Sequence, residues 1–212
     1  PEGSVAVLPV RADGSLAPVV QVESHQASKV HPRQVSGHVH SVVSSPDGQY
    51  LFAPDLGADK VFVYRYAPEQ AERPLQAADP AFVPTPPGSG PRHLIFSADG
   101  RFAYLTLELS GQVMVFAHEG NGRLHQLQTH DLTPAGFQGK VGAGALHLVD
   151  RSQAGLLAAA GLASAMLAEV GEGVARVAQP LRRRVEGVAG IAVAVADVGL
   201  AHQAPVEGLH IA

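Results

Sequence analysis

The chain has 212 residues, no cysteine, and 15 lysines and arginines against 19 acidic residues, for a formal net charge of −4. This charge argues against a nucleic-acid binder with a broad basic surface. The lack of cysteine excludes disulfides, thiolate zinc sites and a cysteine nucleophile. The longest uncharged apolar run, Ala154–Ala168, is shorter than the ~20 residues that span a bilayer, so we expect no membrane partner.

The first two thirds of the chain contain an internal repeat. The segment 44–52 and the apolar run 60–64 recur 52 residues later as 97–104 and 112–116. Each copy has an Asp-Gly dipeptide between short apolar runs, which is a strong hairpin signal because glycine accepts the positive φ of such turns. The repeat therefore predicts units of short antiparallel strands.

A weaker third copy precedes these two. Residues 5–16 align with residues 113–124 at a spacing of 108, about twice the period. Four-stranded units at this spacing are typical of β-propeller blades. We predict an all-β fold, a partial β-propeller of about three blades over residues 1–148, with a β-sandwich as the alternative. The proline-rich stretch Pro80–Pro91 is predicted to be the loop that leads into the next blade.

Residues 149–212 form a second region of different composition. All eleven aromatic residues precede residue 138, and alanine, valine, glycine and leucine dominate the tail. We expect this tail to be irregular or helical, with a helix over 154–170 and a break at Pro180, although the alternation over 188–198 fits a strand equally well. Translation out of frame and a divergent terminus are two hypotheses for its origin.

Four segments carry a resemblance to a known family: Gly37–Gly48, Asp55–Asp59, Gly88–His93 and Glu108–Leu109. They resemble the seven-bladed propeller lactonases, which include 6-phosphogluconolactonases and fungal carboxymuconate-cyclising enzymes. The similarity covers about residues 1–148. Seven blades at the observed period need about 364 residues, so the resemblance implies a fragment of such a propeller, and we expect the natural start to precede Pro1.

The resemblance implies a carboxylic ester hydrolase that opens a sugar lactone, with 6-phosphogluconolactone as the expected substrate in the oxidative pentose phosphate route. It implies no cofactor, a small anionic lactone as partner, and a cytoplasmic location with the periplasm left open. Self-association through blade faces that absent blades leave uncovered is also expected. A carboxymuconate-type cycloisomerase and a non-catalytic binding propeller remain as alternatives.

Lactone hydrolysis needs an activated water, a group that stabilises the developing oxyanion and a handle for an anionic substrate. By resemblance, these catalytic roles fall to His40, Arg92 and Glu108. Arg92 would hold the anion or the oxyanion, because its planar fork suits phosphate and carboxylate. His40 and Glu108 would handle water and protons, with Glu108 acting either as a base or only to orient Arg92.

Three further histidines are expected to bind substrate: His38, His93 and His147. His38 and His40 alternate along a predicted strand, so they would share a face, and a zinc site is a rival interpretation. No third ligand lies nearby in the sequence, and no metal is expected. A solvent-facing His40 and a structural Arg92–Glu108 ion pair are the simpler alternatives. The family's further arginine from a later blade is missing, so the site is expected to be incomplete.

Overall fold

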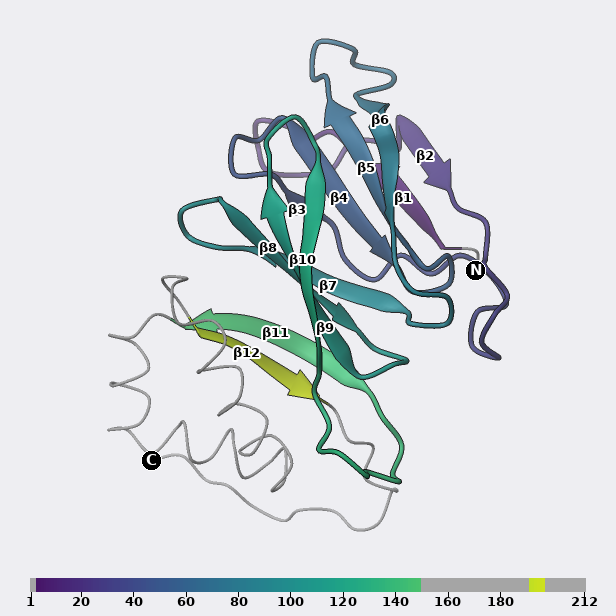
Figure 1. Cartoon of the computed structure of the whole chain (residues 1–212). Coiled ribbons are helices and arrows are strands. Elements are labelled where there is room, and N and C mark those ends of the chain that lie inside the picture. The colour runs from purple at the N-terminus through teal and green to yellow at the C-terminus, as the bar shows by residue number, and fades with distance from the viewer. Residues whose placement is uncertain (1–2, 150–190, 197–212) are drawn as a thin grey trace, which may run out of the picture.

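The computed structural model describes residues 3–149 and 191–196, and this part of the chain forms strands and turns without a helix (Figure 1). Its centre consists of two four-stranded antiparallel sheets. The first sheet contains β3 (Val43–Ser44), β4 (Tyr50–Asp55), β5 (Lys60–Tyr66) and β6 (Leu75–Pro84). The second contains β7 (Pro91–Phe96), β8 (Phe102–Leu107), β9 (Gln112–His118) and β10 (Leu124–Asp131).

The strand order of both sheets is that of propeller blades. Within each sheet, hydrogen-bonded neighbours follow one another in chain order. A β-sandwich of the Greek-key kind would interleave strands from distant parts of the chain. The predicted all-β partial propeller is therefore confirmed for the described residues.

The 52-residue sequence repeat is also a repeat of hydrogen bonds. In the first sheet, the Ser45 amide donates to the Tyr50 carbonyl at 2.8 Å; in the second, the Ser97 amide donates to the Phe102 carbonyl at 2.9 Å. The hairpin glycines Gly48 and Gly100 have φ of 70° and 71°, a backbone conformation that glycine adopts without steric cost. Both Asp-Gly turns thus close the β3–β4 and β7–β8 hairpins as predicted.

Two smaller strand pairs flank the sheets. β1 (Ser4–Val7), which overlaps the weaker third copy of the repeat at 5–16, pairs with β2 (Gln21–Ser24). β11 (Ala143–Val149) pairs with β12 (Ile191–Ala196), so the alternating segment at 188–198 does contain a strand. The predicted helix over 154–170 and its break at Pro180 lie outside the described residues. The boundary between residues 148 and 149 stays a prediction.

The proline-rich stretch is only partly a loop, which corrects the prediction for Pro80–Pro91. β6 continues to Pro84, so the connection to the second sheet is residues 85–90 alone. β6 pairs only with β5, and an edge strand tolerates prolines because their missing amides are not needed by a further neighbour. The register shift opposite Phe62 and Tyr64 accommodates Pro80.

The first sheet is covered on both faces. On its inner strands, Phe52, Val61 and Val63 pack into a core shared with Leu105 and Phe116 of the second sheet. Residues on the opposite face, such as Ala53, Tyr64 and Leu75, pack with Val5 of β1. Because successive strand residues point to opposite faces, continuous apolar strands suit a sheet that is buried on both sides.

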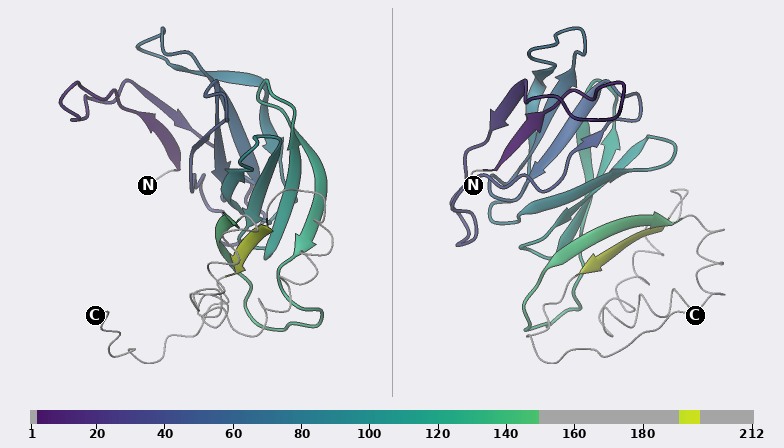
Figure 2. Two further views of the ribbon diagram at one scale, coloured as in Figure 1. Left: turned by 90° about the vertical axis from the view of Figure 1, so that its left-hand side faces the viewer. Right: turned by 180° about the vertical axis from the view of Figure 1, so that it is seen from behind.

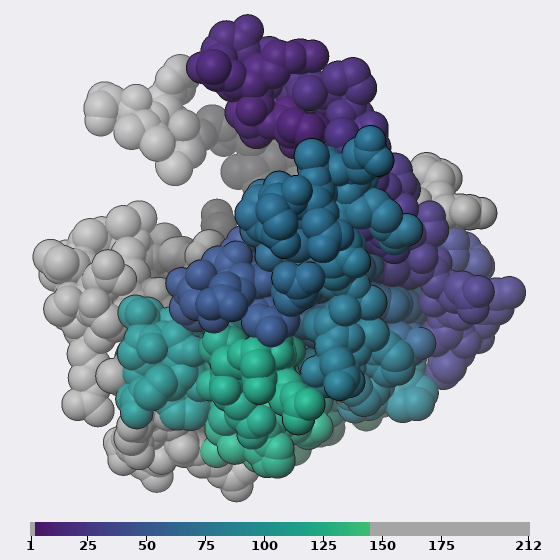
Figure 3. Space-filling view, turned by 90° about the horizontal axis from the view of Figure 1, so that it is seen from above, coloured from purple at the N-terminus to yellow at the C-terminus, as the bar shows by residue number. Residues whose placement is uncertain are grey.

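The sheets consequently follow one another through space in chain order. Figure 2 shows the purple β1–β2 pair on one side of the first sheet and the green strands of the second sheet on the other. Figure 3 shows the same order from above, with the blue and teal segments between the purple and green ends. The site described below lies at the junction between these sheets.

Exposed apolar side chains concentrate near the N-terminal strand pair. Most of the large apolar residues that the described part exposes precede residue 36, including Val10, Leu16 and Val22. Self-association through such uncovered faces stays a prediction. Among the described residues, no helix has the length and hydropathy needed to cross a membrane.

The shared core gives a test of the packing between the two sheets. Leu105 is fully buried within it, whereas Leu127 on β10 is about half exposed. We expect Leu105→Ala to lower the free energy of unfolding by about 2 to 5 kcal/mol, because it removes buried methyl groups and leaves a cavity. Leu127→Ala, the matched control, should change it by less than about 0.5 kcal/mol. Urea denaturation of both variants measures the difference; equal losses would contradict the described packing.

Candidate active site

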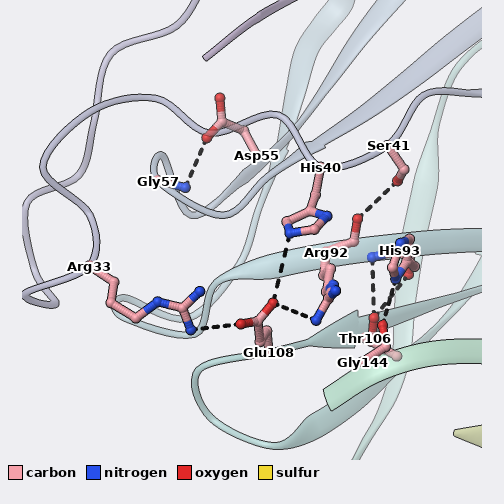
Figure 4. Close-up of polar contacts among 10 residues, drawn as sticks. All are labelled: Arg33, His40, Ser41, Asp55, Gly57, Arg92, His93, Thr106, Glu108 and Gly144. Carbon is pink, nitrogen blue, oxygen red and sulfur yellow. Dashed lines mark hydrogen bonds and ion pairs between the residues drawn. The ribbon is translucent and has the colours of Figure 1, made fainter. Parts of the chain in front are cut away.

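The predicted trio of His40, Arg92 and Glu108 meets at the junction between the sheets (Figure 4). Nη1 of Arg92 lies 2.9 Å from Oε2 of Glu108, and Nε2 of His40 lies 3.9 Å from the same oxygen. All three side chains are mostly buried, with Glu108 only 10% exposed. These residues are 68 positions apart in the sequence at most, and only the sheet packing brings them together.

His40 is held by backbone pairing with the end of β4. Its amide donates to the Pro54 carbonyl at 3.0 Å, and Val39 forms an isolated bridge with Asp55. The rings of His38 and His40 stack with centroids 5.5 Å apart, so these alternating residues share a face as predicted.

Arg92 and Glu108 are positioned by the turn before β7. The Glu108 amide donates to the Gly90 carbonyl at 2.7 Å, and the Ser41 hydroxyl donates to the Arg92 carbonyl at 2.9 Å. Gly90 has a φ of 64°, and a Cβ there would collide with Leu109. A glycine at this position therefore lets the strand bearing Arg92 pass close to Glu108.

His93 also reaches this site, beside His40. Its ring meets the His40 ring edge to face with centroids 5.5 Å apart. Its Nδ1 donates to the Gly144 carbonyl at 2.6 Å, because a carbonyl oxygen can only accept. His147 lies in β11 opposite Val193, but its side chain is outside the described residues. The substrate-binding roles of His38, His93 and His147 stay predictions.

One residue at the site, Arg33, was not predicted from the sequence. Arg33, 75 positions before Glu108, donates from Nη1 to Oε1 of Glu108 at 2.6 Å. Glu108 thus lies between two guanidinium groups, one at each oxygen. The signal available in the sequence was the Pro32-Arg33 dipeptide, which matches Pro91-Arg92, but nothing local connects it to Glu108.

Two buried carboxylates, one at the end of β4 and the other in the turn that follows, fix the loops of the site. Asp59 accepts hydrogen bonds from the amides of Gly88 and Gly90 at 2.8 and 3.0 Å. It also accepts from Nε2 of Gln34 at 2.7 Å and from the Ser28 hydroxyl at 2.8 Å. Asp59 therefore ties the turn before Arg92 to the loop that carries Arg33.

Asp55 fixes the position of the segment that contains His38 and His40. It accepts from the His38 amide at 2.6 Å, and from the amides of Gly57 and Ala58 at 2.9 and 3.0 Å. Its second oxygen lies 2.7 Å from Nδ1 of the buried His25, whose Nε2 pairs with the Tyr64 hydroxyl at 2.6 Å. Burial, together with the charges of Glu23 and Asp55, raises the pKa of Tyr64, so this hydroxyl keeps its proton.

The electrostatic environment keeps His40 neutral. Burial lowers the pKa of His40 below 6.5, and the positive charge of Arg92 lowers it further, against an opposing effect of Glu108. At pH 7 the ring is therefore able to accept a proton.

Two buried polar atoms at the centre of the site lack a hydrogen-bond partner within the described part of the chain. They are Nε of Arg92, a donor, and Oε2 of Glu108, an acceptor. Oε2 of Glu108 nevertheless has an ionic partner, because Nη1 of Arg92 lies 2.9 Å from it, whereas Nε of Arg92 has no partner among the described residues. A buried donor beside a buried acceptor favours a polar ligand or water.

A zinc site finds no support in the described residues. Among the side chains that the structure describes, which do not include His147, no three histidine, aspartate or glutamate residues are grouped to hold a metal ion. His38, His40 and His93 lie near one another as stacked or edge-to-face rings rather than as convergent ligands.

The charge balance around His40 can be measured directly. We expect a pKa for His40 below 6.5 by NMR titration of the ring. Arg92→Gln should raise this pKa because it removes a positive charge, and Glu108→Gln should lower it because it removes a negative one. Arg101→Gln, at an exposed arginine paired with Asp99, should leave it unchanged. Shifts of the same sign in the first two variants would contradict the described geometry.

Comparisons with known proteins agree with this fold and site. Residues 1–159 match the family model described as "Lactonase, 7-bladed beta-propeller". The crystal structure of the periplasmic gluconolactonase PpgL of Pseudomonas aeruginosa is 95% identical over 72% of this chain and 42% of that protein, with a TM-score of 0.70. A solved structure from Lactobacillus plantarum is 32% identical over 69% of this chain and 41% of that one, with a TM-score of 0.63.

Among curated proteins, 6-phosphogluconolactonase of Bacillus subtilis is 31% identical over 147 residues, 69% of this chain. The chain spans 40% of the length of that relative. Because the family model covers three quarters of the sequence and the two sheets have the strand order of its blades, the chain belongs to the seven-bladed β-propeller lactonase family.

Proposed function

We propose that this chain carries a catalytic site for hydrolysis of the ring ester of a sugar lactone. The observation that carries the proposal is the buried Nε of Arg92, a donor without a hydrogen-bond partner in the described residues, beside a neutral His40. Ester hydrolysis needs such a donor for the developing oxyanion, and an acceptor such as a neutral imidazole for a proton of water.

In the proposed reaction, His40 takes a proton from a water molecule as its oxygen bonds to the lactone carbonyl carbon. Arg92 stabilises the negative charge that develops on the carbonyl oxygen. The bond from that carbon to the ring oxygen then breaks, and the imidazolium returns its proton to the leaving oxygen. The product is the open hydroxy acid.

Glu108 is proposed to organise the site. Arg33 and Arg92 occupy its two oxygens, and its Oε2 faces Nε2 of His40. This arrangement favours the second of the two predicted roles for Glu108, that of orienting Arg92. The lowered pKa of His40 supports His40 as the base.

The substrate class rests on the relatives. The 95% identical structure is described as a periplasmic gluconolactonase, and the curated B. subtilis relative is a 6-phosphogluconolactonase. We therefore propose gluconolactones, with the phosphorylated form and its place in the pentose phosphate route as the expectation from sequence. The Pseudomonas structure supports a periplasmic location over the predicted cytoplasmic one, and cell fractionation distinguishes them.

Hydrolysis is tested with glucono-1,5-lactone and its 6-phosphate, by following acid release at constant pH. We expect Arg92→Gln to lower kcat about 10²- to 10³-fold, because the oxyanion loses a preorganised donor. His40→Gln should lower it about 10²-fold or more. The Arg101→Gln control should retain activity.

The pH profile is an independent part of this test. Since His40 must be neutral to accept a proton, kcat/KM should fall as the pH drops through its pKa, with a midpoint below 6.5. Full activity of Arg92→Gln would instead show that Arg92 is not catalytic, and absence of turnover of either lactone by the unchanged chain would support the non-catalytic propeller. Cyclisation of a carboxymuconate without lactone hydrolysis would support the cycloisomerase.

A further inference from the structure

We propose that Arg33 is a substrate-binding residue that binds an oxyanion group, phosphate or carboxylate, on the lactone. This inference rests on the proposed function and adds the class of substrate. Arg33 is 55% exposed at its side chain, whereas Arg92 is 26% exposed and has its Nε buried. The two guanidinium groups therefore flank Glu108 with one toward the interior and the other toward solvent.

The charged groups around Glu108 have a net positive charge, which favours binding of an anion. Within the described part of the chain, Glu108 is the only acidic side chain that forms an ion pair with either Arg33 or Arg92. One carboxylate balances one of the two guanidinium charges, so one positive charge remains for a ligand. Nearby His40 adds no further charge, because its lowered pKa leaves the ring neutral.

The backbone beneath Arg33 is fixed although its side chain is exposed. Gln34 is fully buried and donates from Nε2 to the Leu56 carbonyl at 2.8 Å and to Asp59 at 2.7 Å. Its Oε1 accepts from the His31 amide at 2.8 Å. An anchored loop that presents an exposed guanidinium is preorganised for binding, since little backbone order is lost when a ligand arrives.

The guanidinium of Arg33 also has N–H donors beyond the one that contacts Glu108. Its described side-chain hydrogen bond uses Nη1 alone, and an arginine has five N–H donors in a planar fork. The fork geometry matches the oxygens of phosphate or carboxylate, which it binds in a bidentate way.

The shape of a phosphorylated gluconolactone suits this pair of arginines. Its carbonyl carbon and the carbon that carries the phosphorylated arm both flank the ring oxygen. When the lactone carbonyl contacts Arg92, the phosphorylated arm is on the side of Arg33. The guanidinium of Arg33 contacts the other oxygen of Glu108 and is therefore close to that arm. A lactone without a charged arm gains nothing from Arg33.

The test compares Arg33→Gln and Arg33→Lys with the unchanged chain. Arg73→Gln is the matched control, because Arg73 is also exposed and pairs with a glutamate, Glu23, at 3.0 Å. Two measurements are made: kcat/KM for glucono-1,5-lactone and its 6-phosphate, and calorimetric binding of gluconate and 6-phosphogluconate. The acids serve as probes because they do not require turnover.

We expect Arg33→Gln to lower kcat/KM for the phosphorylated lactone and affinity for 6-phosphogluconate about 10- to 100-fold, chiefly through KM. The change for the unphosphorylated lactone should stay below about 3-fold. Arg33→Lys should restore part of the loss, because it keeps the charge without the fork. Added salt should weaken binding of 6-phosphogluconate more than binding of gluconate.

Other results overturn the inference. An equal fall for both lactones would show that Arg33 only positions Glu108, and no change in either would show that it binds no substrate group. A lactone that bears a carboxylate in place of the phosphorylated arm is assayed alongside, and a selective loss for it would identify the other source of the oxyanion. Absence of lactone turnover in the unchanged chain contradicts the proposed function, while the binding measurements still decide the role of Arg33.

Discussion

The site depends on two buried carboxylates, one at the end of β4 and the other in the turn 56–59 that joins β4 to β5. Asp55 and Asp59 accept hydrogen bonds from backbone amides and side-chain donors in segments before and after the first sheet. Through them, the loop of Arg33, the segment of His40 and the turn before Arg92 take up fixed positions. Buried carboxylates are costly unless hydrogen bonds satisfy them, so the same bonds that offset this cost also define the site.

The position of the site follows from how the sheets pack. Apolar residues cover both faces of the first sheet, so polar groups of its strands can gather only at strand ends and in the connecting loops. Residues of the connections before β3 and after β8 meet Arg92 of β7 at one such end, where β4 and β8 finish. Loops held on rigid sheets are common positions for binding and catalytic residues.

The sequence predicts what is local or repeated. Both Asp-Gly hairpins, the blade-like strand units and the shared face of His38 and His40 follow from patterns a few residues long. Arg33 and the His25–Asp55–Tyr64 contacts were missed because partners 30 to 75 positions apart leave no local pattern. Local composition also misassigned Pro80–Pro84, since the edge position that tolerates proline is a property of the whole sheet.

The division of roles between Glu108 and His40 follows from charge. A carboxylate between two guanidinium groups holds both in place, but its oxygens are already engaged by positive charge. An imidazole beside the same groups is driven to its neutral form, because burial and Arg92 both disfavour a second positive charge. Burial and Arg92 thus support His40 as the proton acceptor, and the two arginines support Glu108 as the organiser. The same pair leaves one positive charge unbalanced, which supports an anionic rather than a neutral lactone.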